Sequence, residues 1–147
     1  MKLGLEAKLY RNTGTYAAPV WTEIDTVKDV TLNLEAGEAD VTTRANGGWR
    51  ATVATLKDGS IEFEMVWDTG DAGFTAIRDA YLNNTPLEMA VMDGDITASG
   101  TYEGLRASMA ITNFSRNEPL EEAITVSVTA KPTYSANPPQ WMTVTNP

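Results

Sequence analysis

Hydrophobic and polar side chains alternate along several segments of the chain, most regularly over residues 60–67. There Glu62 and Glu64 point to one side of an extended strand. Four apolar side chains point to the other: Ile61, Phe63, Met65 and Trp67. Weaker alternation recurs over residues 3–10, 27–34, 49–56, 87–91, 105–111 and 124–128. A period of two over this much of the chain predicts antiparallel β-structure with one apolar and one wet face.

A short turn signal separates two of these segments. Lys57, Asp58 and Gly59 lie between residues 49–56 and 60–67. An Asp-Gly pair favours a tight turn because glycine tolerates a positive φ. The pattern predicts a β-hairpin formed by these two segments.

One segment has helical periodicity instead. In residues 71–84, apolar and amphipathic side chains recur at the spacing of one helix face, with Asp71 as a candidate N-cap and Pro86 after the end. A single amphipathic helix must pack against a sheet. We therefore expect one mainly β domain over residues 1–147, a β-sandwich or small barrel of two packed antiparallel sheets with one flanking helix. Its expected core is Phe63, Met65, Trp67, Phe74, Ile77, Met109, Ile111, Val126 and Val128.

Two segments have no evident core of their own. Residues 35–48 (EAGEADVTTRANGG) are polar with three glycines, which predicts a long inter-strand loop at a binding surface. Residues 131–147 hold four of the seven prolines and predict an extended C-terminal arm, in which Trp141 either packs back onto the domain or anchors on another subunit. We expect both segments to contact neighbouring subunits, because alone they cannot offset their ordering entropy. The candidate contact residues are Glu35, Glu38, Asp40, Val41, Arg44, Trp49 and Trp141.

Composition removes several classes of function. The chain has no cysteine and no histidine, so it has no disulfide, thiol nucleophile or Ser-His pair. Its 11 basic and 20 acidic residues give a net charge of −9, which disfavours binding to a phosphate backbone. No apolar run approaches the length of a membrane span, and the N-terminus lacks a signal-peptide pattern. We expect a soluble, non-enzymatic protein of the cytoplasm, without cofactor or metal.

Two other functions stay open on the residues alone. Glu62 and Glu64 are candidates for the paired carboxylates of a hydrolase, although glycosidases usually take such a pair from separate elements. Aromatic residues in proline-containing segments are also compatible with a carbohydrate-binding β-sandwich module. The run Asp93, Gly94 and Asp95 lacks the ligand spacing of a calcium loop and predicts an ordinary turn.

The order of these features resembles a known family. The polar segment 35–48 leads into Trp49, and the helical segment follows the most regular strand. The sequence TNFSRNEPLEE (residues 112–122) precedes ITVSVTAKP (residues 124–132). In the order of these segments and in the sequence of residues 112–132, the chain resembles the major tail tube proteins of long-tailed bacteriophages. The resemblance covers residues 3–135.

The resemblance implies a β-sandwich with a flanking helix that forms hexameric rings, stacked into a tube for genome delivery and similar to type VI secretion tubes. The implied partners are other copies of the chain, the tape-measure protein, tail terminator or tip proteins, and double-stranded DNA that passes without specific binding. The implied location is the virion tail, assembled in the host bacterial cytoplasm. The alternative function is a virion decoration or carbohydrate-binding β-sandwich module. An acidic lumen would repel a passing duplex, and we expect Glu62, Glu64 and Glu103 to face it.

Overall fold

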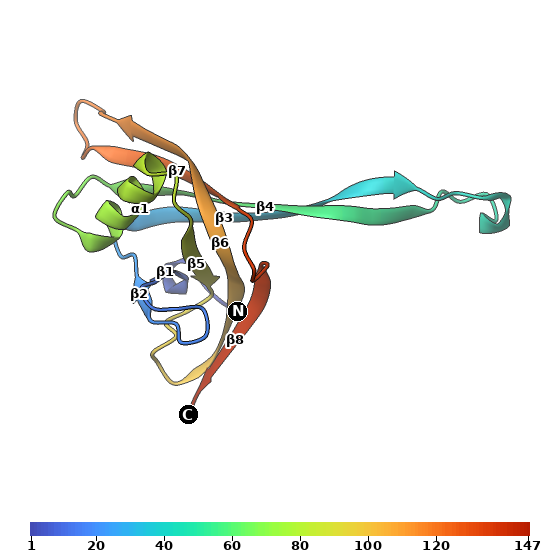
Figure 1. Ribbon diagram of the computed structural model, residues 1–147, viewed down its shortest axis with the longest axis horizontal. Helices are drawn as coiled ribbons and strands as arrows, with labels where there is room; N and C mark the ends of the chain where they lie inside the picture. The colour runs from blue at the N-terminus through green and yellow to red at the C-terminus, as the bar shows by residue number, and fades with distance from the viewer.

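The computed structural model describes residues 1–147 as eight strands and one α-helix (Figure 1). The helix α1 spans Ala72–Leu82, and two 3₁₀ turns span Gly4–Glu6 and Arg44–Asn46. No helix is long and apolar enough to cross a membrane. The strands are β1 (Lys8–Asn12), β2 (Trp21–Glu23), β3 (Val27–Asp40), β4 (Thr52–Val66), β5 (Leu87–Met92), β6 (Gly100–Asn117), β7 (Thr125–Pro132) and β8 (Gln140–Asn146).

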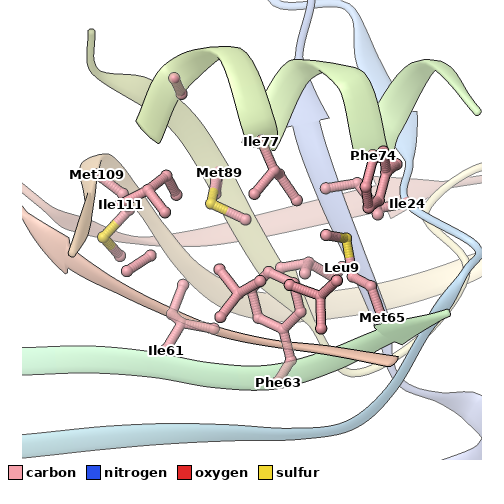
Figure 2. Packing of buried hydrophobic residues seen from close by; sticks show 14 of the residues in the cluster. Leu9, Ile24, Ile61, Phe63, Met65, Phe74, Ile77, Met89, Met109 and Ile111 are labelled. Carbon is pink, nitrogen blue, oxygen red and sulfur yellow. The ribbon is translucent and has the colours of Figure 1, made fainter. Parts of the chain in front are cut away.

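All eight strands belong to one antiparallel sheet with the order β2-β1-β5-β6-β7-β4-β3, and β8 pairs with β6. The mainly β fold with one flanking helix is confirmed. The layers expected as two separate sheets are two parts of this single open sheet, which bends around one core. Leu9 and Met89 from one part pack in the same cluster as Phe63 and Met65 from the other (Figure 2).

The main core contains 16 buried residues, and α1 covers it. Phe74 and Ile77 point from the helix into the cluster (Figure 2). The Asp71 carboxylate accepts a hydrogen bond from the Phe74 N–H at 2.9 Å and so caps the helix as expected. Trp67 is only partly buried and packs against the cluster. The other expected core residues lie inside it: Phe63, Met65, Phe74, Ile77, Met109, Ile111, Val126 and Val128.

The expected turn at residues 57–59 is wrong, because β4 runs through it without a break. Asp58 pairs with Glu35, and Gly59 pairs with Leu34 on β3. A Cβ on Gly59 would lie 3.2 Å from Leu34 Cδ2. Gly59 therefore makes room for a neighbouring side chain inside a strand, and the continuous ladder with β3 outweighs the local preference for a turn.

The expected loop over residues 35–48 is also wrong in its first half. Residues 35–40 continue β3 and pair with β4 as far as Asp40 and Thr52, with a register shift between Ala36 and Glu38. Only residues 41–51 connect the strands, so the loop is the tip of a long two-stranded hairpin. The hairpin extends far from the body of the molecule (Figure 1).

The C-terminal segment folds back onto its own sheet instead of forming a free arm. β8 pairs with β6 from Gly100 to Arg106, on the same edge where β7 pairs farther along. Met142 and Val144 pack against a second small cluster, which lies on the sheet face opposite the main core. The buried members of that cluster are Tyr10, Ala90, Met92 and Ile96.

We predict that Phe63→Ala lowers the free energy of unfolding by about 3–5 kcal/mol, because it removes a buried aromatic ring and leaves a cavity. Urea denaturation monitored by circular dichroism measures this change. Glu62→Gln is the matched control, since its side chain points out of the same strand, and we expect a change within about 0.5 kcal/mol. A loss below about 1 kcal/mol for Phe63→Ala would contradict the assignment of the core face.

Candidate assembly surfaces

The hairpin arm, defined as residues 34–58, is the most exposed part of the molecule. Beyond the last β4–β7 pair, Ile61 with Ala130, the nine residues back to Thr52 extend about 30 Å. An isolated two-stranded ribbon in water is at best marginally stable. Trp49 and Leu56 are 80% and 86% exposed. The remaining large exposed hydrophobic residues of the arm are Leu34, Val41 and Val53.

Local hydrogen bonds give the arm tip, residues 41–51, a defined shape. The Thr42 N–H donates to Asp40 Oδ1 at 2.8 Å, and the Ala51 N–H donates to Thr42 Oγ1 at 2.8 Å. Thr43 caps the short 3₁₀ turn that follows. Arg44 and Arg50 are the two charged residues of the tip. The tip thus presents an exposed indole and two positive charges on an ordered turn.

A polar surface covers the sheet face opposite the main core. Glu62 pairs with Thr31 on β3 and Thr129 on β7, and Thr129 pairs with Asn113 on β6. Glu64 pairs with Ser127 one step along. Side chains of directly paired residues lie on the same face of a sheet. Glu62 and Glu64 therefore lie on one polar sheet face that no other element covers, as their alternation in the sequence predicted.

Two more carboxylates continue the same face toward the arm. Asp58 lies four residues before Glu62 in the same strand alternation, and it lies directly opposite Glu35. Like charges in this position are mildly destabilising in an isolated sheet. Lys131 borders the same shallow hollow as these two carboxylates.

Glu103 does not join this acidic face. The register of β6 shifts between Ile111 and Asn113, so residues before and after the shift alternate in opposite phase. Glu103 lies on the side of Leu105, which belongs to the main core, and the Trp141 indole N–H donates to its carboxylate at 3.4 Å. Grouping Glu103 with Glu62 and Glu64 was therefore wrong. Trp141 remains 58% exposed at the start of β8.

Sequence reasoning missed a buried ionic cluster on the other end of the sheet. Arg106 is buried, forms an ion pair with Glu88, and donates a hydrogen bond to the Tyr16 carbonyl at 2.6 Å. Its guanidinium lies 3.8 Å from the Tyr16 ring centroid and 5.1 Å from that of Trp21. The cluster fastens the β1–β2 connection to the sheet and holds Trp21 on its own domain. Arg106 occupies a polar position of the strand pattern, which gives no sign of burial.

A second missed feature is an apolar groove of about 630 Å³ between the N-terminal turn, β1 and the start of β3. Val30 and Leu32 pack against the main core from this side and remain partly exposed. Asp29 beside them has a positive φ of 54°, where the β3–β4 register shifts. The apolar residues that line the groove are Leu5, Ala7, Leu9, Ile24, Val27, Val30, Leu32 and Val91.

The arrangement offers interaction surfaces and not a reaction centre. Glu62 and Glu64 lie on an open sheet face, whereas the carboxylates of a glycosidase flank a bound sugar. No group of three or more Asp, Glu, His or Cys side chains is placed to hold a metal ion.

The chain matches the family described as phage tail tube proteins over residues 9–133, and it belongs to that family. This is a family of structural proteins without enzymatic activity. No individually curated protein matches the chain in sequence.

Solved structures share the fold. The tail of an empty gene transfer agent particle, refined with C6 symmetry, has a TM-score of 0.72 at 14% identity and covers 92% of this chain and 96% of its own. The SPP1 tail tube has a TM-score of 0.70 at 18% identity, with 89% and 75% covered. The PVC sheath-tube complex of an extracellular contractile injection system has a TM-score of 0.63 at 7% identity, with 98% and 93% covered.

The titration of Asp40 tests the hydrogen bonds at the arm tip. Hydrogen bonds from the side chain and backbone of Thr42 lower the pKa of Asp40 from its usual value of 3.8. A lowered pKa means that the carboxylate supports the tip above its unfolded-state pKa, and that this support is lost as the pH falls through the folded-state pKa. We expect an NMR titration of Asp40 to show a midpoint below 3.8.

Thr42→Val should return the midpoint toward the usual value, because it removes the hydroxyl. Thr43→Val is the control, since Thr43 caps Ala45 instead. An unchanged Asp40 titration in Thr42→Val would contradict the tip geometry described above.

Proposed function

We propose that copies of this chain form hexameric rings that stack into the tube of a virion tail, a conduit for genome delivery. Membership of the tail tube family and the fold shared with assembled tubes support this function. The observation that carries the assembly mechanism is the hairpin arm. It exposes Leu56 about 17 Å from the body and Trp49 about 30 Å from it, beyond contact with the core of the same chain.

The arm provides the contacts between copies. Burying a large apolar side chain contributes about 1.5–3 kcal/mol, so contact of the exposed Trp49 and Val41 with a second subunit stabilises the assembly. Charged side chains along the same ribbon would set its orientation on the partner. The residues assigned to this interface are Glu35, Glu38, Asp40, Val41, Arg44 and Trp49.

Two long strands of the sheet have free edges. The outer edge of β3 extends over 14 residues, and the outer edge of β8 over 7. Exposed edges of this length invite pairing with another strand, and a closed ring of subunits would cover them. Trp141 on β8 is placed to join such a lateral contact.

The polar face with Glu62 and Glu64 faces the lumen in this proposal. Repeated carboxylates repel phosphates within about one Debye length, roughly 8 Å at physiological salt. Double-stranded DNA then passes without binding specifically, because the wall does not retain it through phosphate contacts. The tape-measure protein occupies the lumen before the DNA, and terminator or tip proteins close the tube ends. The tube assembles in the host bacterial cytoplasm and is carried in the virion tail.

Shortening the arm tests the assembly role. Asp40 and Thr52 are paired residues, so residues 41–51 can be replaced by an Asn-Gly turn. We expect a folded monomer that forms no tubes in negative-stain microscopy. Its circular dichroism spectrum should be that of a folded β protein. Normal polymerisation of this variant would reduce the arm to a connection and would refute its role in assembly.

Reversing the charge of the polar face tests the lumen placement. The double change Glu62→Lys and Glu64→Lys should leave the monomer folded and slow DNA ejection from intact particles, because each ring then offers lysines to phosphates. Glu121→Lys with Glu122→Lys on the β6–β7 connection makes the same change in charge elsewhere and should leave the ejection rate unaltered. Unchanged ejection at low salt in the first variant would count against the lumen assignment.

A further inference from the structure

The groove beside β3 is an opening in the main core. Leu9 is a fully buried core residue and also lines the groove, and Val30, Leu32 and Val91 pack against the same core. α1 covers the core elsewhere, and the outer edge of β3 has no partner strand here. At about 630 Å³, the groove is within the size range of sites that enclose a bulky apolar group.

The arm cannot fill the groove of its own molecule. The groove lies at the base of β3. From there the β3–β4 ribbon extends away from the body (Figure 1). The eight residues from Leu32 to Asp40 span about 25 Å, so the tip lies that far from the groove. A tip that enters this groove must therefore come from another copy.

We propose that the apolar groove receives the arm tip of a second copy, with Trp49 as the anchoring side chain. This inference rests on the proposed tube assembly and names the receiving surface for the arm. Trp49 is a large aromatic residue without a partner on its own chain, and aromatic anchors dominate the energy of protein interfaces. The groove supplies the apolar walls that such an anchor requires.

The charges around the two surfaces are complementary. Lys8 and Glu23 on the rim pair with each other at 2.9 Å. The other charged lining residues are Asp25, Lys28 and Asp29, which leaves an excess of one negative charge, and Asp29 also borders the hollow at Glu62 and Glu64. The tip carries Arg44 and Arg50 and no acidic residue. Opposite charges at the rim of an interface favour encounter and orientation, while the apolar contact provides the affinity.

Disulfide trapping tests the contact directly, because the chain has no native cysteine. Leu5 lines the groove, and its side chain is 91% exposed, so Leu5→Cys should fold normally. Combined with Ala45→Cys in the exposed tip, it should give intermolecular disulfides in oxidised tubes. The matched control combines Ala45→Cys with Leu120→Cys, another exposed leucine, on the β6–β7 connection.

A double-mutant cycle provides a second measurement. Trp49→Ala and Leu5→Ala should each raise the critical concentration for polymerisation, Trp49→Ala by about tenfold or more. If the two residues meet across the interface, the double variant should raise it by less than the product of the single effects. This measurement does not depend on the assembly of the cysteine variants.

The outcomes separate this inference from the proposed function. Disulfides through position 5 and a non-additive cycle support the groove as the receiving site. Disulfides through position 120, or a strictly additive cycle, would overturn the groove as the receiving site. Either result leaves the proposed tube function intact. If the thiol of the Leu5→Cys variant is protected from alkylation in the isolated monomer, the chain's own N-terminal residues fill the groove. That result would also overturn the groove as the receiving site. Tubes formed without residues 41–51 would refute the role of the arm itself.

Discussion

The fold depends on β6, because this one strand joins both parts of the bent sheet. It pairs with β5 along one edge and with β8 and then β7 along the other. The close packing requires Gly104, where a Cβ would lie 1.7 Å from the Val91 carbonyl oxygen. The register shift after Ile111 then moves Phe114 onto the core side, where its ring centroid lies 5.9 Å from that of Phe74. One strand thus supplies two successive stretches of the core. Odd-numbered residues face the core before the shift, and even-numbered residues face it afterwards.

This arrangement determines what remains exposed. The core uses the apolar face of β4 only from Ile61 to Met65, where β7 covers its other edge. Nearer the arm, β4 has β3 as its only partner, and both faces of the ribbon meet water. Large side chains such as Trp49 and Leu56 therefore stay outside the folded unit without weakening its core. A monomer can be stable with its assembly contacts unsatisfied.

The sequence predicted those elements whose side chains divide clearly between an inside and an outside. Residues 60–67 and the helix were predicted for this reason. The resemblance to tail tube proteins came from the order of the segments and from residues 112–132. Residues 35–40 of the arm were missed because a ribbon with two wet faces shows no regular period of two, whereas residues 52–56 lie in a segment whose alternation did predict a strand. The turn expected at Gly59 failed because a tertiary ladder outweighed a dipeptide preference. Glu103 and the groove depend on a register shift and on the bending of the sheet, neither of which is visible in local periodicity.

A single docked tip is too small to hold two copies together. An aromatic anchor buries about 150–250 Å², whereas a stable interface buries about 800 Å² on each partner. In the proposed assembly each copy offers one arm and one groove, which are heterologous surfaces, so contacts repeat from copy to copy. Several weak contacts made together by a ring act at high effective concentration, although each fails alone. The proposed contacts therefore favour monomers below a concentration threshold and long tubes above it, with growth from existing ends in preference to dimers in solution.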